Sequence, residues 1–156
     1  FQVEPHRLLT ALAEFCAVRG SRLAVQDYPA WPVVRQAWRE MQGSPDCHAI
    51  AFVSRDRCGV LFIEQPRLSL PVASLQAFLD HYLPDQPDAR LDYIHGEDTL
   101  EQLGVQPGNI GFYLPALAKD DFLRTVIRDG ALPRKTFSMG EADEKRFYLE
   151  CRRIAP

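Results

Sequence analysis

Two short apolar runs, separated by a charged tip, constrain the fold more than any other feature of the chain. Residues 49–54 and 59–64 are rich in β-branched and aromatic side chains, and Arg55, Asp56 and Arg57 lie between them. Runs of this length and composition predict an antiparallel hairpin. Arg55 and Arg57 are of the right type to contact a phosphate or a partner, although charged hairpin tips are commonly only solvated.

Helical periodicity surrounds this hairpin in the first half of the chain. The predicted elements before and after it are a helix over residues 6–19, a short strand at Leu23 and Val25, a helix opened by Pro29 and Pro32 and ended by Gly43, and a helix over residues 71–83. Each proline falls where the missing N–H of a first helical turn costs little. The apolar residues of each helix recur on one stripe, as expected of helices that pack on a sheet.

The second half predicts alternating strands and helices. We expect strands at 90–94, 110–114 and 146–152, a short helix capped by Asp98 and ending at Gly104, and a helix that follows Asp120 and Asp121 and ends at Gly130. The two helices would serve as crossovers, so parallel pairing is possible in this half. The predicted class is therefore α+β (mixed α/β), with one mixed sheet of about five strands, an antiparallel hairpin and helices packed on it.

Length, composition and charge limit the protein class. The 156 residues, 46% of them hydrophobic, suit a single domain over 1–156, with a possible subdivision near 84–89. A net charge of −3 argues against a nucleic-acid binder. We find no run of about 20 apolar residues that would span a membrane. The chain begins at Phe1 without an initiator Met, so we expect it to be the C-terminal fragment of a larger protein.

The four cysteines are scattered, without a C-x-x-C pair. Cys16 and Cys151 occupy apolar faces of predicted elements and are expected to be buried thiols. A disulfide framework is not indicated, and a reducing cytoplasm is the expected location.

The richest concentration of hydrogen-bonding side chains lies in the loop before the last predicted strand. It offers two cations, two hydroxyls and a glycine at Arg134, Lys135, Thr136, Ser138 and Gly140. Arginine, lysine, hydroxyl and backbone donors are the groups that bind a phosphate or carboxylate. The stretch lacks the spacing of a P-loop. Its hydroxyls could equally satisfy the backbone of the loop while its cations face water. We therefore treat residues 133–140 as a candidate anion site.

A second candidate region surrounds His95. His95 and Gly96 follow the strand predicted at 90–94 and precede a helix, at the edge where α/β sheets bind ligands. A histidine there could titrate near neutrality and act as a catalytic group. It could also simply bond the local backbone. If the pairing is parallel, the 133–140 loop enters its strand from the opposite edge, so the two regions need not meet.

No other pattern indicates a metal, a cofactor or a known catalytic set. His6 lies at a helix start, His48 in a turn and His81 on the third predicted helix, without metal-ligand spacing. The chain also lacks nucleotide-binding and nucleophile-elbow motifs. Trp31 and Trp38 are predicted to be core residues, although together with Tyr148 they could instead form an exposed patch for a partner.

Three stretches resemble a known family. The run from Leu132 to Arg152, the segment that begins Leu70-Pro71-Val72, and the segment Arg90–Gly96 followed by Ile110–Leu114 are similar to the C-terminal part of the bacterial family called domain of unknown function 1015. The resemblance spans roughly residues 70–154. It implies a larger parent whose upstream part is similar to ParB/sulfiredoxin-like proteins. The Asp-Gly-His-His-Arg motif of that upstream part does not occur here.

These observations predict an accessory, ligand-contributing domain of a cytoplasmic bacterial protein. It would pack on the missing N-terminal part of the same protein and offer the 133–140 loop to a phosphate-bearing small molecule. One alternative is an interaction or assembly module without a ligand site. Another is part of a nucleotide-using, kinase-like enzyme whose catalytic residues lie upstream. The sequence does not predict the oligomeric state.

Overall fold

The computed structural model of the chain describes residues 1–41, 44, 46–94, 96–114 and 121–130. The elements follow in the order α1 (Pro5–Val18), β1 (Arg22–Tyr28), α2 (Trp31–Glu40), β2 (Cys47–Ser54), β3 (Cys58–Glu64), α3 (Pro71–Tyr82), η1 (Leu83–Asp85), α4 (Glu97–Gly104), β4 (Ile110–Tyr113) and α5 (Asp121–Asp129). The chain is thus α+β, as its periodicity predicts.

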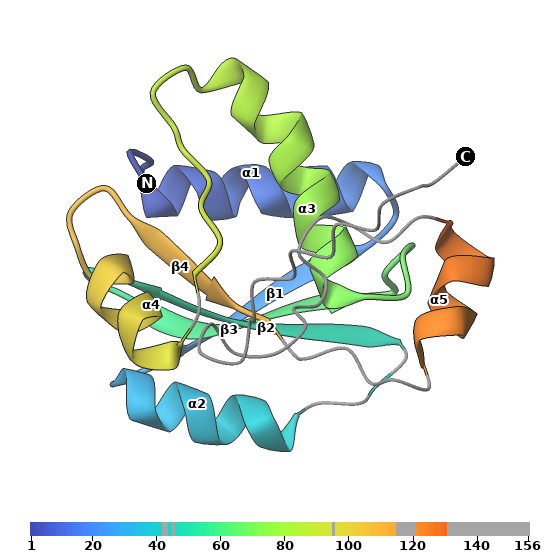
Figure 1. Cartoon of the computed structure of the whole chain (residues 1–156), viewed down its shortest axis with the longest axis horizontal. Helices are drawn as coiled ribbons and strands as arrows, with labels where there is room; N and C mark the ends of the chain where they lie inside the picture. Colours follow the sequence, from blue (N-terminus) through green and yellow to red (C-terminus); the bar gives the residue numbers. More distant parts are fainter. Residues whose placement is uncertain (42–43, 45, 95, 115–120, 131–156) are drawn as a thin grey trace, which may run out of the picture.

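The strands of the described part form one antiparallel sheet of four strands, in the order β1-β3-β2-β4. β2 and β3 form the predicted hairpin, with Ala51 opposite Val60. β1 pairs with the outer side of β3, and β4 pairs with the outer side of β2, both antiparallel. Two apolar central strands are therefore flanked by shorter or more exposed ones (Figure 1).

The predicted mixed sheet is wrong for the described residues, because residues 90–94 do not form a strand. Their backbone bonds are local or reach the start of the chain: Arg90 N–H donates to the Phe1 carbonyl, and Tyr93 N–H to its neighbour Asp92. Without that strand there is no strand–helix–strand crossover onto β4. The last predicted strand, residues 146–152, lies outside the described residues.

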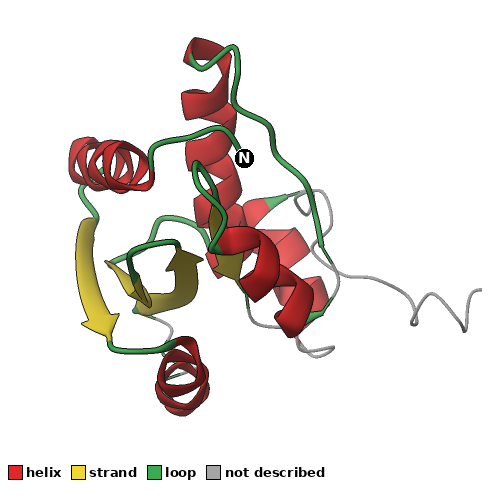
Figure 2. Cartoon of the chain, turned by 90° about the vertical axis from the view of Figure 1, so that its left-hand side faces the viewer, coloured by secondary structure: helices red, strands yellow, loops and turns green. Residues whose placement is uncertain are grey.

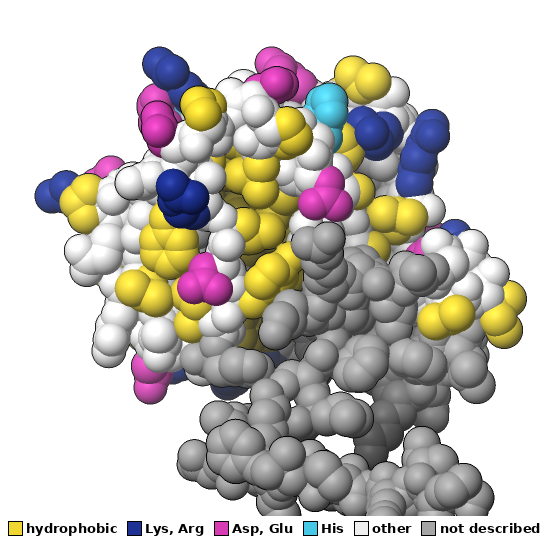
Figure 3. Space-filling model, turned by 45° about the horizontal axis from the view of Figure 1, so that its top comes forward, with side chains coloured by type: hydrophobic (Ala, Val, Ile, Leu, Met, Phe, Trp, Pro, Cys, Tyr) yellow, Lys and Arg dark blue, Asp and Glu magenta, His cyan; other side chains and the backbone are white. Residues whose placement is uncertain are grey.

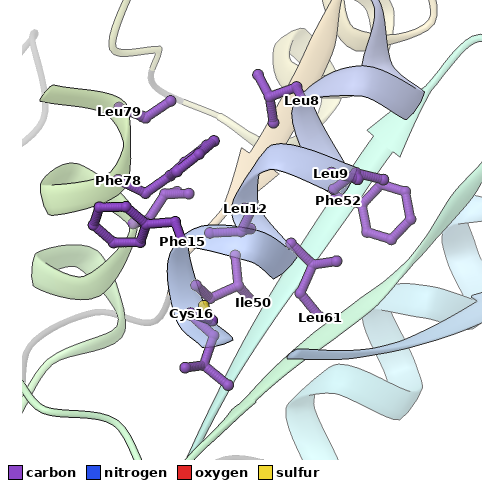
Figure 4. Packing of buried hydrophobic residues seen from close by; sticks show 12 residues of the cluster. Leu8, Leu9, Leu12, Phe15, Cys16, Ile50, Phe52, Leu61, Phe78 and Leu79 are labelled. Atoms are coloured by element: carbon purple, nitrogen blue, oxygen red, sulfur yellow. The ribbon is translucent and has the colours of Figure 1, made fainter. Parts of the chain in front are cut away.

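Helices cover both faces of the sheet, and each face has its own core (Figures 1 and 2). α1 and α3 cover the face that carries Ile50, Phe52 and Leu61. α2 covers the opposite face, where Trp31, Val34 and Trp38 pack on alanines and valines of the central strands. The side chains in Figure 4 show how α1 and α3 meet over the first face. The Phe15 and Phe78 rings are in edge contact there, with 5.5 Å between the ring centres. Alternation along β2 and β3 thus supplies both cores.

α4 does not begin as predicted. The residue before its first turn is Gly96, at φ 92°, and the helix starts at Glu97 without a side-chain cap. Asp98 therefore lies inside the first turn, where its negative charge still suits the helix dipole. Its carboxylate is 3.7 Å from the Arg35 guanidinium. The predicted aspartate cap is wrong by this geometry.

Buried tryptophans fill the α2 face of the sheet. Trp31 is 3% exposed and Trp38 is 5% exposed. The Trp38 indole N–H donates to the Ala49 carbonyl at 2.9 Å, which ties α2 to β2. The core prediction for both is confirmed, and the alternative of an exposed patch is wrong for these two. Tyr148, its third member, lies outside the described residues.

Two further predictions concern the cysteines and the membrane-spanning helices. Cys16 is a buried free thiol, as expected, whereas Cys151 lies outside the described residues. None of the helices in the described part combines the length and the hydrophobicity that a bilayer span requires.

Candidate functional site

Of the two regions singled out in the sequence, the 133–140 loop lies wholly outside the described residues, and the region around His95 is described except for His95 itself. Arg134, Lys135, Thr136, Ser138 and Gly140 lie outside the described residues, and so does His95. The neighbours of His95 on both sides, Ile94 and Gly96, are described, and both line a pocket. We call it the edge pocket, because it lies along β4, at the end of the sheet.

The edge pocket has a volume of about 360 Å³. One wall is β4 with Leu114, a second is α3 with Val72 and Leu75, and a third is α4 with Leu100. The segment 90–94 closes the fourth side, held by the backbone contact between Phe1 and Arg90. Figure 3 shows hydrophobic side chains gathered around a hollow on the face formed by α1, α3 and the segment after α3.

Few polar groups face this apolar space. Tyr93 O–H donates to the Gln76 side-chain oxygen at 2.8 Å, which bridges the segment 90–94 to α3. The Asn109 amide donates to the Leu103 carbonyl at 2.8 Å. Arg90 and Asp92 supply one charge of each sign at the rim. A small number of placed polar groups in an apolar pocket is typical of a small-molecule site.

Glycines allow α4 to approach the sheet at the back of the pocket. A Cβ on Gly104 would lie 2.7 Å from Val53 Cγ1 and 3.0 Å from the Val53 carbonyl. A Cβ on Gly111 would lie 3.1 Å from Leu100. Any larger residue at these two positions would push α4 outward, so the glycines determine how deep this wall lies.

A charged network fixes the start of α4 beside the pocket. Glu97 accepts hydrogen bonds from Tyr113 O–H at 2.6 Å, from Arg35 at 2.8 Å and from Arg39 at 3.0 Å. The bond from Tyr113 lowers the pKa of Glu97 below 4.5, with help from both arginines, while burial opposes this. Burial and the same bond raise the pKa of Tyr113 above 10. At neutral pH this network holds an ionised Glu97 and a protonated Tyr113, which is a structural clamp rather than an acid–base pair.

A second polar cluster lies between α3 and the face of the sheet that α3 covers. His48 is 3% exposed in β2, and its Nδ1 is 3.1 Å from the Ser74 hydroxyl on α3. Burial lowers its pKa to about 4, against the opposing effects of a hydrogen bond at the Ser69 backbone and of the Asp129 charge. Asp129 in turn accepts a hydrogen bond from Ser69 N–H at 2.5 Å. His48 was predicted to lie in a turn, and this is wrong because β2 begins at Cys47.

The described residues contain no cluster of three or more His, Cys, Asp or Glu side chains that could hold a metal.

The sequence pattern pointed to the neighbourhood of His95 but not to the pocket beside it. Gly104 and Gly111 gave the available signal, because glycine inside a helix or strand marks a close approach. The sequence pattern does not indicate the pairing of β4 with β2 that brings these walls together.

Comparison with known proteins adds no relative. No protein-family model matches the chain, and no match was found among curated proteins or solved structures.

Proposed function

We propose that this chain is a ligand-binding domain and that the edge pocket is its binding site. The observation that carries the proposal is a single space of about 360 Å³ whose walls come from α3, the segment 90–94, α4 and β4. Pockets of 300–1,000 Å³ lined mainly by apolar side chains are the usual sites for small molecules.

The walls favour a ligand with an apolar body and a few hydrogen-bonding groups. Leu75, Ile94 and Leu100 would contact the body, and Tyr93, another lining residue, could accept a hydrogen bond on the hydroxyl that it donates to Gln76. Charges of both signs at the rim, from Arg90 and Asp92, do not favour a highly charged ligand. The chemistry therefore fits a small, largely neutral organic molecule.

A direct test uses N-phenyl-1-naphthylamine, a neutral apolar fluorophore, and the variant Val72→Trp. Val72 lines the pocket from α3 and is half-buried, so a tryptophan there would fill the space without removing a core residue. We expect saturable binding by the wild type and about a tenfold loss of affinity in the variant.

The matched control is Val33→Trp, which places the same side chain at a 43% exposed position of α2. It should bind the fluorophore like the wild type. Equal loss in both variants, or no saturable binding by the wild type, would refute the edge pocket as the site.

We propose the 133–140 loop as a second, anion-binding part of the function. Its support is the density of donors at Arg134, Lys135, Thr136 and Ser138, together with the resemblance to a family whose members have an upstream part. In this proposal the chain contributes a binding surface that the upstream part completes. Any catalytic residues, including those of a kinase-like enzyme, would then lie upstream.

This second part is tested with inorganic phosphate, a nucleoside monophosphate and phosphoserine, read out by melting temperature. A shift in the wild type that is absent from the double variant Arg134→Ala, Lys135→Ala would support it. If none of the three probes shifts the melting temperature of either the chain or a longer parent protein, the anion proposal fails while the edge pocket stands.

The rival proposal, an interaction or assembly module, has less support. Trp31 and Trp38 are buried in the core and are not available to a partner. In the described part, the large exposed apolar side chains are spread over several elements: Val18, Val25, Val33, Leu91, Tyr93, Val105, Val126 and Ile127.

A further inference from the structure

A smaller cavity of about 190 Å³ lies on the other side of α3 from the edge pocket. We call it the α1–α3 pocket, because the C-terminal half of α1 and the middle of α3 form two of its walls. Residues 66–68, after β3, form the third. Its lining is mainly apolar and includes Phe15, Cys16, Ile63, Pro66, Leu68 and Ala77.

Two guanidinium groups lie at this pocket. The Arg19 guanidinium carbon is 3.6 Å from the centre of the Phe15 ring, a stacked cation–π contact. Arg67 Nε donates to the Arg19 backbone carbonyl at 2.6 Å, which holds the Arg67 side chain at the C-terminal end of α1. Both side chains are thus positioned by contacts that leave their terminal NH₂ groups available.

Neither of these arginines has a carboxylate partner among the described residues. Other described arginines do pair with acidic side chains, namely Arg7, Arg22, Arg35, Arg39, Arg57 and Arg128. Both arginines of the lining carry a positive charge, and an anion that binds at the pocket would be attracted to both. The local charge therefore favours a negatively charged group at the mouth of an apolar pocket.

The other polar groups of the pocket do not oppose an anion. Burial raises the pKa of the Cys16 thiol, although the Arg19 charge acts against this, so the thiol is neutral at pH 7. The Ser21 hydroxyl is engaged with the Gln65 carbonyl at 2.9 Å. The Ser74 hydroxyl at the pocket floor pairs with His48.

We propose that the α1–α3 pocket binds a small monocarboxylate. Its hydrocarbon part would lie against Phe15, Ile63 and Leu68, and its carboxylate would bridge Arg19 and Arg67. A guanidinium presents parallel N–H donors that match the two oxygens of a carboxylate. The small apolar interior favours a short aliphatic or aryl carboxylate over a free phosphate, which would have no use for these walls. This site is separate from the edge pocket and does not depend on it.

The proposal is tested with hexanoate as the probe and hexanol as its neutral counterpart, observed by NMR titration of the whole chain. We expect hexanoate to shift the amides around Arg19, Arg67 and Ala77, and to bind about tenfold more tightly than hexanol. Arg67→Gln should weaken hexanoate by about tenfold and leave hexanol unchanged.

Two variants complete the test. Arg55→Gln removes a hairpin-tip arginine that also lacks a carboxylate partner in the described part, and it should bind hexanoate like the wild type. Ala77→Met fills the pocket from α3 and should weaken both probes, with thermal melting used to confirm that it folds. Three results would each overturn the proposal. They are equal affinity for hexanoate and hexanol, unchanged hexanoate binding in Arg67→Gln, and a loss of hexanoate affinity in Arg55→Gln as large as that in Arg67→Gln. Binding that is lost in Val72→Trp but kept in Ala77→Met would overturn it as well, by assigning hexanoate to the edge pocket.

Discussion

His48 is buried beneath α3, and burial disfavours the protonated form of its imidazole. Only 3% of its surface is exposed, and burial lowers its pKa from 6.5 to about 4. Between these two values the unfolded chain binds a proton that the folded chain does not. Protonation therefore favours unfolding, and stability falls as the pH drops from about 6.5 to about 4.

The first prediction is that His48→Gln reduces this pH dependence. Urea unfolding at pH 7 and pH 4.5 should show that the wild type loses about 2–3 kcal/mol more than the variant over this range. The nearby Asp129 carboxylate and the Ser69 and Ser74 groups are present in both proteins, so the difference between them isolates His48. His6→Gln, at an exposed position, is the control and should follow the wild type. Parallel curves for wild type and His48→Gln would contradict the assignment.

The hydrogen bond from Tyr113 to Glu97 should make a measurable contribution to the free energy of unfolding. The Tyr113 hydroxyl donates to the ionised Glu97 at 2.6 Å, and the Glu97 side chain is only 22% exposed. We predict that Tyr113→Phe lowers the free energy of unfolding by about 1–2 kcal/mol, because an ionised acceptor loses a donor while the ring keeps its edge contact with Trp38.

The matched comparison is an exposed ion pair, Arg57 with Asp27, whose side chains are 38% and 54% exposed. Asp27→Asn should cost less than about 0.5 kcal/mol, since solvent screens the pair. Urea unfolding of both variants decides the matter. If Tyr113→Phe costs no more than Asp27→Asn, the clamp at the start of α4 is not a stabilising feature.

At the scale of elements, the packing of α4 on the sheet depends on Gly104. We predict that Gly104→Ala destabilises the fold by about 1–2 kcal/mol, although alanine is the better helix former by about 1 kcal/mol. The new Cβ would lie 3.0 Å from the Val53 carbonyl, which belongs to a central strand and moves only with the sheet. Gln102→Ala, on the exposed side of the same helix, should be neutral or slightly stabilising.

A second substitution shows whether this cost is steric. Val53→Ala removes the Cγ1 atom that a Gly104 Cβ would approach at 2.7 Å. In a double-mutant cycle the two changes should therefore couple favourably. Additive costs would mean that Gly104→Ala acts through some other contact.

Elements with a strong apolar pattern could be predicted from the sequence, and those with a weak pattern could not. The hairpin and α1 were predicted to within a few residues, because their apolar faces recur at the period of their own structure. The segment 90–94 carries the same kind of side chains, yet it bonds to Phe1 instead of joining the sheet. Pairing is decided by which edge is available, and that information is not local.

The candidate site, too, could be predicted only in part from the sequence. His95 and Gly96 were singled out for their place between two predicted elements, and Gly96 does line a pocket. The other walls belong to residues 72–79 of α3 and residues 100–114 of α4 and β4, and the pairing of β4 with β2 places β4 among them. His48 was missed because the predicted strand began at residue 49, two residues after the true start of β2 at Cys47. The alternation His48, Ile50, Phe52 would have placed it on a buried face.

At the scale of the whole molecule, two cores share the central strands β2 and β3. Side chains of one parity face α1 and α3, and those of the other face α2. Because each strand contributes to both faces, neither core can lose its packing without loosening the sheet that supports the other. The described part should therefore unfold as one cooperative unit.

The two tryptophans of the chain allow this to be tested, because both lie in the α2 core. We predict that Leu12→Ala, in the α1 core, lowers stability by about 2–4 kcal/mol and shifts the tryptophan fluorescence transition as far as the far-UV circular dichroism transition. Val18→Ala, 85% exposed on the same helix, should shift neither signal. A fluorescence midpoint that stays in place while the dichroism midpoint falls would mean that the two faces unfold separately. Coincident midpoints would mean that a cavity beneath α1 is felt through the full thickness of the sheet, as a shared pair of central strands requires.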